Sequence, residues 1–269
     1  MKFERESSRA GVLVVQADWH AAVHGLGLLA PGGLERWLAS APSGGSGRTA
    51  TALVSVPGAG PRVVVRRLRH GGLLAPFFGD RYASAGRVLR ELDVTARLRA
   101  VGAPVPEPVL ALARRRGLAY SLALATVYEE GAVDALAFLA SEPEDERIER
   151  AAAAVGGALR RFHDAGGRHP DLHVKNLLLR ETRAGAEAIV IDLDRGRLGA
   201  APPPRARAAE LGRLWRSLVK RGVGERVGER GAAAFLAAYC AGDRALRDAL
   251  VRRFPAELQK TRLHALFYR

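Results

Sequence analysis

The chain has 269 residues, of which 48% are hydrophobic and 26% are charged. These fractions match soluble globular proteins and exclude a disordered or collagen-like chain. Uncharged stretches such as 117–128 and 231–242 hold about a dozen residues, and the longest, 19–34, holds 16, whereas a membrane-spanning helix needs about 20. The length favours one large domain or two lobes around one cleft.

A single cysteine, Cys240, excludes an internal disulfide framework and a cysteine-rich zinc site. The first ten residues, MKFERESSRA, mix acids and bases before a short apolar run. A signal peptide begins instead with a positively charged stretch followed by a longer apolar one. We therefore expect a cytoplasmic location.

The net charge is +14, because 42 lysines and arginines stand against 28 aspartates and glutamates. Such a surplus favours anionic partners: nucleotides, phospholipid surfaces or nucleic acid. Only four of the basic residues are lysines and the chain is rich in alanine and glycine, so codon bias is an equally good explanation. The arginines are spread along the chain and aromatic residues make up 6%, unlike the basic and aromatic surface of a single-strand binder. Nucleic acid is therefore not an expected partner.

The first half of the chain predicts mostly short strands, at 12–15, 51–56, 62–68 and 118–127. Helical patterns lie near Leu34 and at 82–100. This half therefore predicts a sheet with one main helix.

The second half, from residue 132 onward, predicts mainly helices. Ser141 and Pro143 give the start signal of one well-marked helix, which glycines end at 166–167. Its apolar stripe recurs at helical spacing and comprises Ile148, Ala152, Val155, Leu159 and Phe162. Two short apolar runs, 177–179 and 189–191, predict a hairpin after it.

The segment between this helix and the hairpin carries the main chemical signal. Phosphoryl transfer from ATP needs a base for the attacking hydroxyl, oxygen ligands for magnesium and a cation on the other phosphates. Asp171 and Asn176 stand in an H-x-D-x4-N segment that begins at His169, and Asp192 follows the hairpin. This spacing is typical of the catalytic and metal loops of kinases. We predict that Asp171 is the catalytic base, that Asn176 and Asp192 bind Mg²⁺, and that His169 braces the loop. The alternative is that Asp171 caps a turn and Asp192 closes a hairpin.

Three glycines, Gly44, Gly45 and Gly47, precede the strand at 51–56. Backbone N–H groups in such a turn can cover the phosphates of a nucleotide, so we predict that they bind ATP. The segment lacks a full G-x-G-x-x-G, and an ordinary hairpin turn is the alternative.

Arg66 ends the strand at 62–68, where a protein kinase carries a lysine, and Glu91 lies on the helix at 82–100. We predict that Glu91 pairs with Arg66 and holds it against the α- and β-phosphates of ATP. The alternatives are a solvent-facing charge for Arg66 and a surface ion pair within one helix for Glu91.

Six collinear segments carry a resemblance to a known family: VVRRLRHGGL (64–73), DRY (80–82), RELDVTARLRAVGAPVPEPVLA (90–111), RRFHDAGGRHPDLHVKNLLL (160–179), IDLDRGR (191–197) and LGRLWRSLVK (211–220). They resemble the lipopolysaccharide kinase family, in particular its branch of 3-deoxy-D-manno-octulosonic acid (Kdo) kinases, which is protein-kinase-like. In that branch arginine commonly ends the third strand, which is consistent with Arg66.

With the patterns of the two halves, the resemblance implies an α+β, two-lobed, protein-kinase-like fold. The N-terminal lobe would be an antiparallel sheet with one main helix, at 1–127, and the mainly α C-terminal lobe would follow at 128–269. The hinge, over which adenine would lie, is expected near 126–130. The resemblance also implies ATP, Mg²⁺ and transfer of the γ-phosphate to the 4-OH of a Kdo sugar on lipid A precursor. The positive charge would give peripheral contact with the anionic cytoplasmic face of the inner membrane.

Some positions depart from the branch. It usually has phenylalanine where Leu193 stands and an asparagine-containing loop where His173 and Lys175 stand beside the predicted base. A core heptose, a small alcohol or a protein therefore stays open as acceptor. The non-enzymatic alternative is an inactive kinase-like module that binds membrane or nucleic acid. No group of residues has the pattern of a Ser-His-Asp triad or a zinc site.

Overall fold

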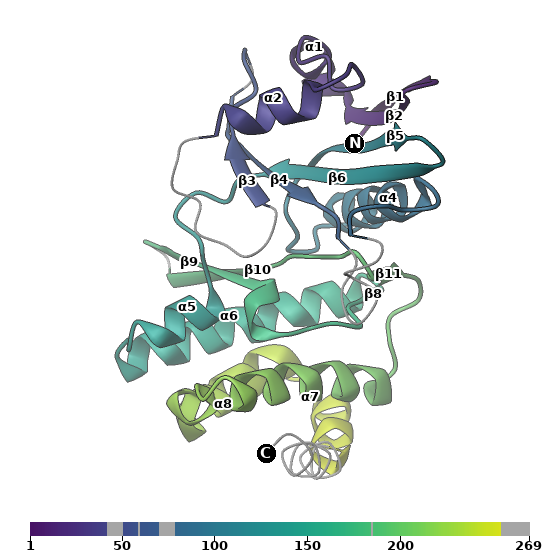
Figure 1. The fold of residues 1–269 in the computed structure, drawn as a ribbon. Helices are drawn as coiled ribbons and strands as arrows, with labels where there is room; N and C mark the ends of the chain where they lie inside the picture. Colours follow the sequence, from purple (N-terminus) through teal and green to yellow (C-terminus); the bar gives the residue numbers. More distant parts are fainter. Residues whose placement is uncertain (42–50, 59, 70–78, 184, 254–269) are drawn as a thin grey trace. The chain divides into compact units, whose positions relative to one another are not determined.

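The computed structural model describes residues 1–41, 51–58, 60–69, 79–183 and 185–253 (Figure 1). The chain forms two compact units. The first comprises 1–100 and 106–129, and the second comprises 101–105 and 130–269. The first is built on an antiparallel sheet and the second mainly on helices, which confirms the predicted α+β class.

The first unit contains a six-stranded antiparallel sheet with the strand order β1-β2-β5-β6-β4-β3. Side chains alternate across this sheet, as in β4, where Val63 and Val65 are buried on one face while Val64 and Arg66 point to the other. The strands are β1 (Phe3–Ser8), β2 (Gly11–Gln16), β3 (Thr51–Val54), β4 (Val63–Arg67), β5 (Pro108–Arg116) and β6 (Ala119–Val127).

Four of the six strands were predicted, whereas β1 and β5 were not. The sequence of β1, FERESS, has no apolar alternation, because this edge strand buries little. The first six residues of β5 are all buried, so the strand is apolar on both faces and lacks the period-two signal.

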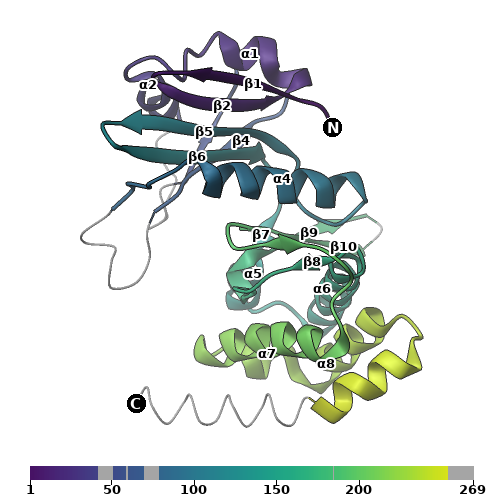
Figure 2. The ribbon, with the colours of Figure 1, turned by 90° about the vertical axis from the view of Figure 1, so that its right-hand side faces the viewer.

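Each face of the sheet is covered by helices (Figure 2). One face packs on η1 (Ala17–Trp19), α1 (His20–His24) and α2 (Gly33–Ala39). The other face packs on α4 (Gly86–Ala100), through Val88 and Leu92. The predicted helix at 82–100 begins later than expected, because Tyr82 forms a β-bridge with Tyr120 instead. The sheet thus separates two apolar layers, and Arg66 lies on the layer of α4.

The second unit combines helices with short strands. The strands β9 (Leu177–Thr182) and β10 (Gly185–Val190) pair antiparallel, which confirms the predicted hairpin. Its helices include α5 (Ala135–Ala140), α6 (Asp145–Asp164), α7 (Pro204–Lys220) and α8 (Gly224–Cys240), and residues 244–253 are also helical. The remaining short elements are β7 (Val133–Asp134), β8 (Gly167–Arg168), η3 (Val174–Asn176) and β11 (Arg197–Leu198).

The predicted start of the long helix at Ser141 is wrong. Ser141 is the C-cap of α5, and its hydroxyl donates to the Phe138 carbonyl at 2.8 Å. The helix α6 begins after Glu144, and Asp145 and Glu146 in its first turn complement the helix dipole. A serine that precedes an acidic turn often marks the start of a helix. Here Ser141 instead ends the short helix α5, which precedes it.

Helices α6 and α8 pack closely because α6 carries a glycine at their contact. A Cβ atom on Gly156 would lie 2.3 Å from the Phe235 carbonyl oxygen, so no larger residue fits without movement of the backbone. The helices of this unit surround an apolar cavity of about 480 Å³, lined by Phe138, Trp215 and Leu250 among others. Within the described ranges, no helix combines the length and the apolar character that spanning a membrane requires.

Candidate active site

The loop that carries Asp171 runs from β8 to β9 in the second unit. Asn176, which is 5% exposed, donates from its side-chain amide to the backbone carbonyl of Asp171 at 3.0 Å. The two residues that the H-x-D-x4-N spacing singled out are therefore joined across the loop. The amide nitrogen makes this bond, so the Asn176 amide oxygen is the atom that suits a magnesium ion.

His169 connects this loop to the segment that carries Asp192. Its ring is almost fully buried, and its Nε2 lies 3.0 Å from the carbonyl oxygen of Ile191. A carbonyl only accepts, so Nε2 carries the hydrogen and the neutral ring has no proton on Nδ1. In return, the Ile191 N–H donates to the Asn176 carbonyl at 3.0 Å. Both polar groups of the residue before Asp192 are thus held by the loop, which supports the predicted bracing role of His169.

Asp192 adopts a left-handed backbone conformation, with φ of 63°. Positive φ is uncommon for residues other than glycine and costs about 1 kcal/mol or more, although aspartate tolerates it better than most. The two hydrogen bonds to Ile191 hold the chain directly before this residue. Strained residues of this kind gather at functional sites.

The negative charges of Asp171 and Asp192 both influence the pKa values of His169 and His173. Burial lowers the pKa of His169 below its ordinary value, while the negative charges of Asp192, Glu210 and Asp171 oppose this effect. Burial likewise lowers the pKa of His173, against the opposing charges of Asp171 and Asp192. The Asn176 side chain donates to the Asp171 carbonyl and the Asn176 carbonyl accepts from Ile191, so the segments that carry Asp171 and Asp192 lie next to each other. The Asp192 carboxylate and the Asn176 amide oxygen are ligand types that a hard divalent cation such as Mg²⁺ prefers.

Glu210, on α7, is a positioning residue that the sequence reasoning missed. It is fully buried and accepts from the backbone N–H of His169 at 2.8 Å and from His163 Nε2 at 3.3 Å. Arg168 contributes a third contact at 3.4 Å. Burial alone would raise the pKa of Glu210, but the bonds from His163 and His169 lower it below its ordinary value. Glu210 thus stays ionised and anchors the start of the loop.

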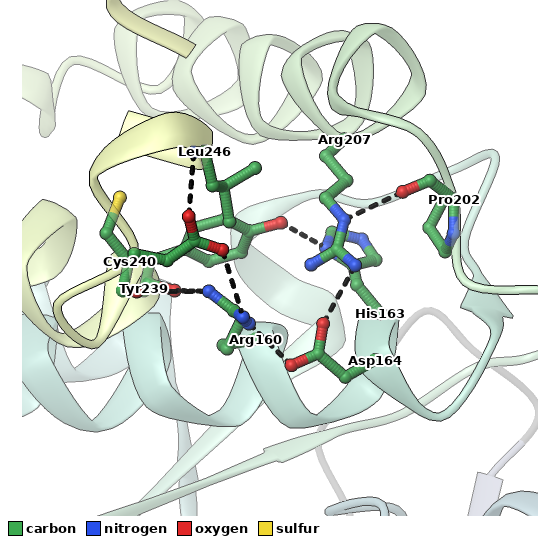
Figure 3. Close-up of polar contacts among 9 residues, drawn as sticks. Arg160, His163, Asp164, Pro202, Arg207, Tyr239, Cys240 and Leu246 are labelled. Carbon is green, nitrogen blue, oxygen red and sulfur yellow. Dashed lines mark hydrogen bonds and ion pairs between the residues drawn. The ribbon is translucent and has the colours of Figure 1, made fainter. Parts of the chain in front are cut away.

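Tyr239, on α8, completes this buried network (Figure 3). Its hydroxyl lies 2.6 Å from His163 Nδ1, and burial raises the pKa of the phenol, which therefore stays neutral. The hydroxyl can donate to Nδ1, which leaves the Nε2–H of His163 to donate to Glu210. His163 is therefore a structural residue. The signal that could have revealed Glu210 is an acid on the buried stripe of an otherwise amphipathic helix.

A second set of contacts ties the same three helices together (Figure 3). Arg207 donates to the Pro202 carbonyl and to Asp164, both at 2.8 Å. Arg160 also pairs with Asp164 and donates to the Cys240 carbonyl at 3.0 Å. Polar contacts as well as apolar packing therefore hold together α6, α7 and α8, the helices that support the loop with Asp171.

In the first unit, Arg66 on β4 and Glu91 on α4 form an ion pair, as the sequence predicted. The Glu91 side chain is 1% exposed and that of Arg66 is 24% exposed. Thr95, one turn further along α4, donates its hydroxyl to the Glu91 carbonyl at 2.8 Å. A largely buried guanidinium is thus held on one face of the sheet, where it can bind phosphate oxygens.

The predicted glycines Gly44, Gly45 and Gly47 lie outside the described residues. Their predicted role in nucleotide binding therefore stays a prediction.

A model of the lipopolysaccharide kinase (Kdo/WaaP) family matches residues 43–239. The chain belongs to this family. Asp171, Asn176, Asp192, Arg66 and Glu91 all lie within the matched range, so the predicted resemblance is confirmed.

Two relatives are similar to this chain over part of its length. The 3-deoxy-D-manno-octulosonic acid kinase of Xylella fastidiosa (strain 9a5c) is 34% identical over 161 residues, or 58% of this chain and 61% of the relative. That of Xanthomonas oryzae pv. oryzae (strain PXO99A) is 35% identical over 175 residues, or 62% and 66%. The similarity thus spans less than two thirds of the length of each relative.

A solved structure of WaaP in complex with acyl carrier protein resembles this chain in fold. Its TM-score is 0.61 at 22% identity, and the alignment covers 96% of this chain and 99% of the other. At this identity the likeness shows a shared fold.

Proposed function

We propose that this chain is an ATP-dependent kinase that transfers the γ-phosphate to the 4-OH of Kdo on lipid A precursor. The family membership supports kinase chemistry. The observation that carries the proposal is the set of hydrogen bonds that joins the loop with Asp171 and Asn176 to Ile191, the residue before Asp192, while Glu210 anchors the start of that loop. If Asp171 only capped a turn and Asp192 only closed a hairpin, neither the hydrogen bonds between their segments nor the buried Glu210 would be needed.

In the proposed reaction, the sugar hydroxyl oxygen forms a bond to the γ-phosphorus while the bond between that phosphorus and the β,γ-bridging oxygen breaks. ADP leaves, and the hydroxyl proton passes to the Asp171 carboxylate. Asp171 also orients the hydroxyl for in-line attack, and such positioning accounts for much of the catalysis in phosphoryl transfer.

Asn176 and Asp192 are the proposed magnesium ligands. Bound magnesium would neutralise charge on the β- and γ-phosphates. The bond between the Asn176 amide nitrogen and the Asp171 carbonyl fixes which amide atom faces a ligand. The hydrogen bonds of Ile191 and the left-handed backbone conformation of Asp192 restrict the main chain here. They therefore also restrict the positions that the Asp192 carboxylate can reach.

Arg66, held by Glu91, is proposed to bind the α- and β-phosphates of ATP. Guanidinium groups bind phosphate oxygens in a bidentate manner, and a buried carboxylate partner fixes the orientation of the fork. Gly44, Gly45 and Gly47 are proposed to cover the same phosphates with backbone N–H groups.

The acceptor is inferred from the relatives, whose names state that they phosphorylate Kdo. An acceptor that is attached to lipid A precursor agrees with the net charge of +14, because this charge favours peripheral contact with the anionic cytoplasmic face of the inner membrane. His173 and Lys175 follow the proposed base, Asp171, by two and four residues. We propose that they contact the acceptor.

The test is Mg²⁺-dependent transfer of labelled phosphate from ATP to a Kdo-containing lipid A precursor, beside a precursor that lacks Kdo. We expect transfer to the first alone, with the label on the 4-OH when the product is analysed by NMR. Transfer to both precursors would disprove Kdo as the acceptor, and label on a different hydroxyl would disprove the 4-OH.

Other acceptors can be separated in the same assay by adding a core heptose substrate, a small alcohol and a generic protein. ATP binding without transfer to any acceptor, together with binding to anionic vesicles or DNA, would favour the inactive module instead. A steep salt dependence would mark the DNA binding as electrostatic.

A further inference from the structure

A cluster of two histidines and two glutamates lies at the edge of the sheet in the first unit. His20 and His24 begin and end α1, and a spacing of four residues puts both on one side of the helix. Glu4 and Glu6 lie on β1, where a spacing of two residues puts both on one face of the strand. Figure 2 shows α1 beside β1, at the edge of the sheet.

Three of these side chains converge. His20 Nε2 lies 3.1 Å and His24 Nδ1 lies 3.2 Å from the same oxygen, Oε1 of Glu6. One possible ligand atom from each of the three residues lies within 4.8 Å of the others. In a tetrahedral zinc site with bonds of about 2.0–2.1 Å, ligand atoms are about 3.4 Å apart. The observed spacing is therefore close to that of a metal site.

The fourth residue holds one of the rings in place. The other ring nitrogen of His20, Nδ1, lies 3.3 Å from Oε2 of Glu4. A metal-binding histidine almost always donates its second ring N–H to a carboxylate or carbonyl, which fixes its tautomer and orientation. Glu4 supplies this partner, so the cluster contains both a ligand set and the outer carboxylate that such a set needs.

We propose that Glu6, His20 and His24 bind a zinc ion, with Glu4 as the outer partner of His20. Two imidazoles and a carboxylate form a ligand set typical of Zn²⁺, whereas imidazole nitrogens are poor ligands for Mg²⁺, so this site is chemically distinct from the proposed magnesium site. His24 is the most exposed of the three, with 70% of its side chain open to solvent, which leaves access for the ion and a fourth, water ligand.

A metal in this site would link α1 to the edge strand β1. Among the described strands, β1 is at the edge of the sheet and pairs with β2. The sequence reasoning expected no zinc site because β1, which supplies both glutamates, was not predicted. The H-x3-H spacing of His20 and His24 is the signal that was available.

The test uses the full chain after treatment with a chelator. Zn²⁺ is titrated in competition with a chromogenic chelator, in the presence of excess Mg²⁺. We expect one zinc ion per chain and a rise in the melting temperature on binding, because the ion binds the folded state. Substitution of Co²⁺ should give the visible absorption of a tetrahedral site.

Four variants locate the ion. His24→Ala and Glu6→Gln should lower the zinc affinity at least tenfold and abolish the rise in melting temperature. Glu4→Gln should lower the affinity about 10-fold, the lower end of the effect of an outer-shell partner. Asp18→Asn, an exposed acid close in sequence to the cluster, is the matched control and should bind zinc like the wild type.

Because His24 is exposed, His24→Ala is expected to fold normally, which circular dichroism checks. Unchanged zinc affinity in both His24→Ala and Glu6→Gln would overturn the proposal, as would the lack of saturable binding by the wild type. These measurements need no phosphate transfer, so their outcome is independent of the proposed kinase activity.

Discussion

In the first unit, Arg66 is held by a side chain, the buried carboxylate of Glu91, whereas in the second unit the loop with Asp171 is held largely through main-chain atoms. The Arg66 contact joins one strand to one helix. The loop contacts involve the backbone N–H of His169 and both polar groups of Ile191. Each unit thus fixes its own candidate residues by a different means.

The difference has a physical consequence. A single ion pair between side chains loses its geometry when either partner is replaced. A loop held at several main-chain points keeps its path when one of its exposed side chains changes. We therefore expect substitutions at Asp171 to affect chemistry with little effect on stability, and substitutions at Arg66 to affect both.

The largest expected effect is that of Asp171→Ala on turnover. Loss of a general base typically slows a reaction by about 10²–10⁴-fold. The Asn176 bond goes to the Asp171 backbone carbonyl, which the substitution retains, so the loop should keep its path. We expect ATP affinity within about twofold of the wild type, because the base acts on the acceptor hydroxyl. Steady-state kinetics and calorimetric ATP titration measure the two quantities, and turnover like that of the wild type would refute the role of Asp171.

Arg66→Ala is expected to have the next largest effect. Removal of one member of a buried ion pair destabilises a protein by about 3 kcal/mol, because the other charge stays in a poorly solvated place. The variant should also bind ATP more weakly, unlike Asp171→Ala. A double-mutant cycle with Glu91→Ala, followed by urea unfolding, measures the coupling between the two side chains. A coupling energy near zero would show that the pair contributes nothing to the stability of the first unit.

A contrast between local spacing and contacts that are distant in the chain explains which residues of the candidate site the sequence could predict. Asp171, Asn176 and Asp192 could be proposed from the sequence because their predicted roles depend on local spacing in one segment. Arg66 and Glu91 were found from their order along the strand and the helix. By contrast, Glu210 lies 41 residues from His169, and Tyr239 lies 76 residues from His163. Contacts of such separation are set by how the helices pack, and no local pattern encodes them.

The fold was predictable to a similar extent. Elements with a clear period, such as β4 and α4, were located, whereas β1 and β5 had no period to detect. The start of α6 was placed wrongly because Ser141 serves the preceding helix α5. The α+β class survived these errors, since it rests on the contrast between the two halves.

A smaller effect, confined to the second unit, is expected from Gly156→Ala. The added Cβ would lie 2.3 Å from the Phe235 carbonyl oxygen, and such overpacking costs about 2 kcal/mol. The neighbouring Gly157 is a matched control, because a Cβ atom there would meet Arg161 at an ordinary 3.6 Å. Gly157→Ala should stabilise the helix by up to about 1 kcal/mol. Urea unfolding of both variants measures the difference, and equal stability would show that α6 and α8 do not pack as described.

The pH dependence of stability should show the smallest effect, and it tests the buried loop anchor. The pKa of His169 lies below its ordinary value of 6.5, so below that pH the unfolded chain takes up a proton that the folded chain does not. The unfolded state then binds more protons, and the free energy of unfolding falls as the pH falls. Glu210, whose pKa is also lowered, adds a loss of the same sign below its ordinary value of 4.5. His169→Gln should therefore lose less stability than the wild type between about pH 7.5 and 5.5 in urea titrations. An identical loss in both proteins would mean that folding does not lower the pKa of His169, and burial of its ring would then not favour the neutral form.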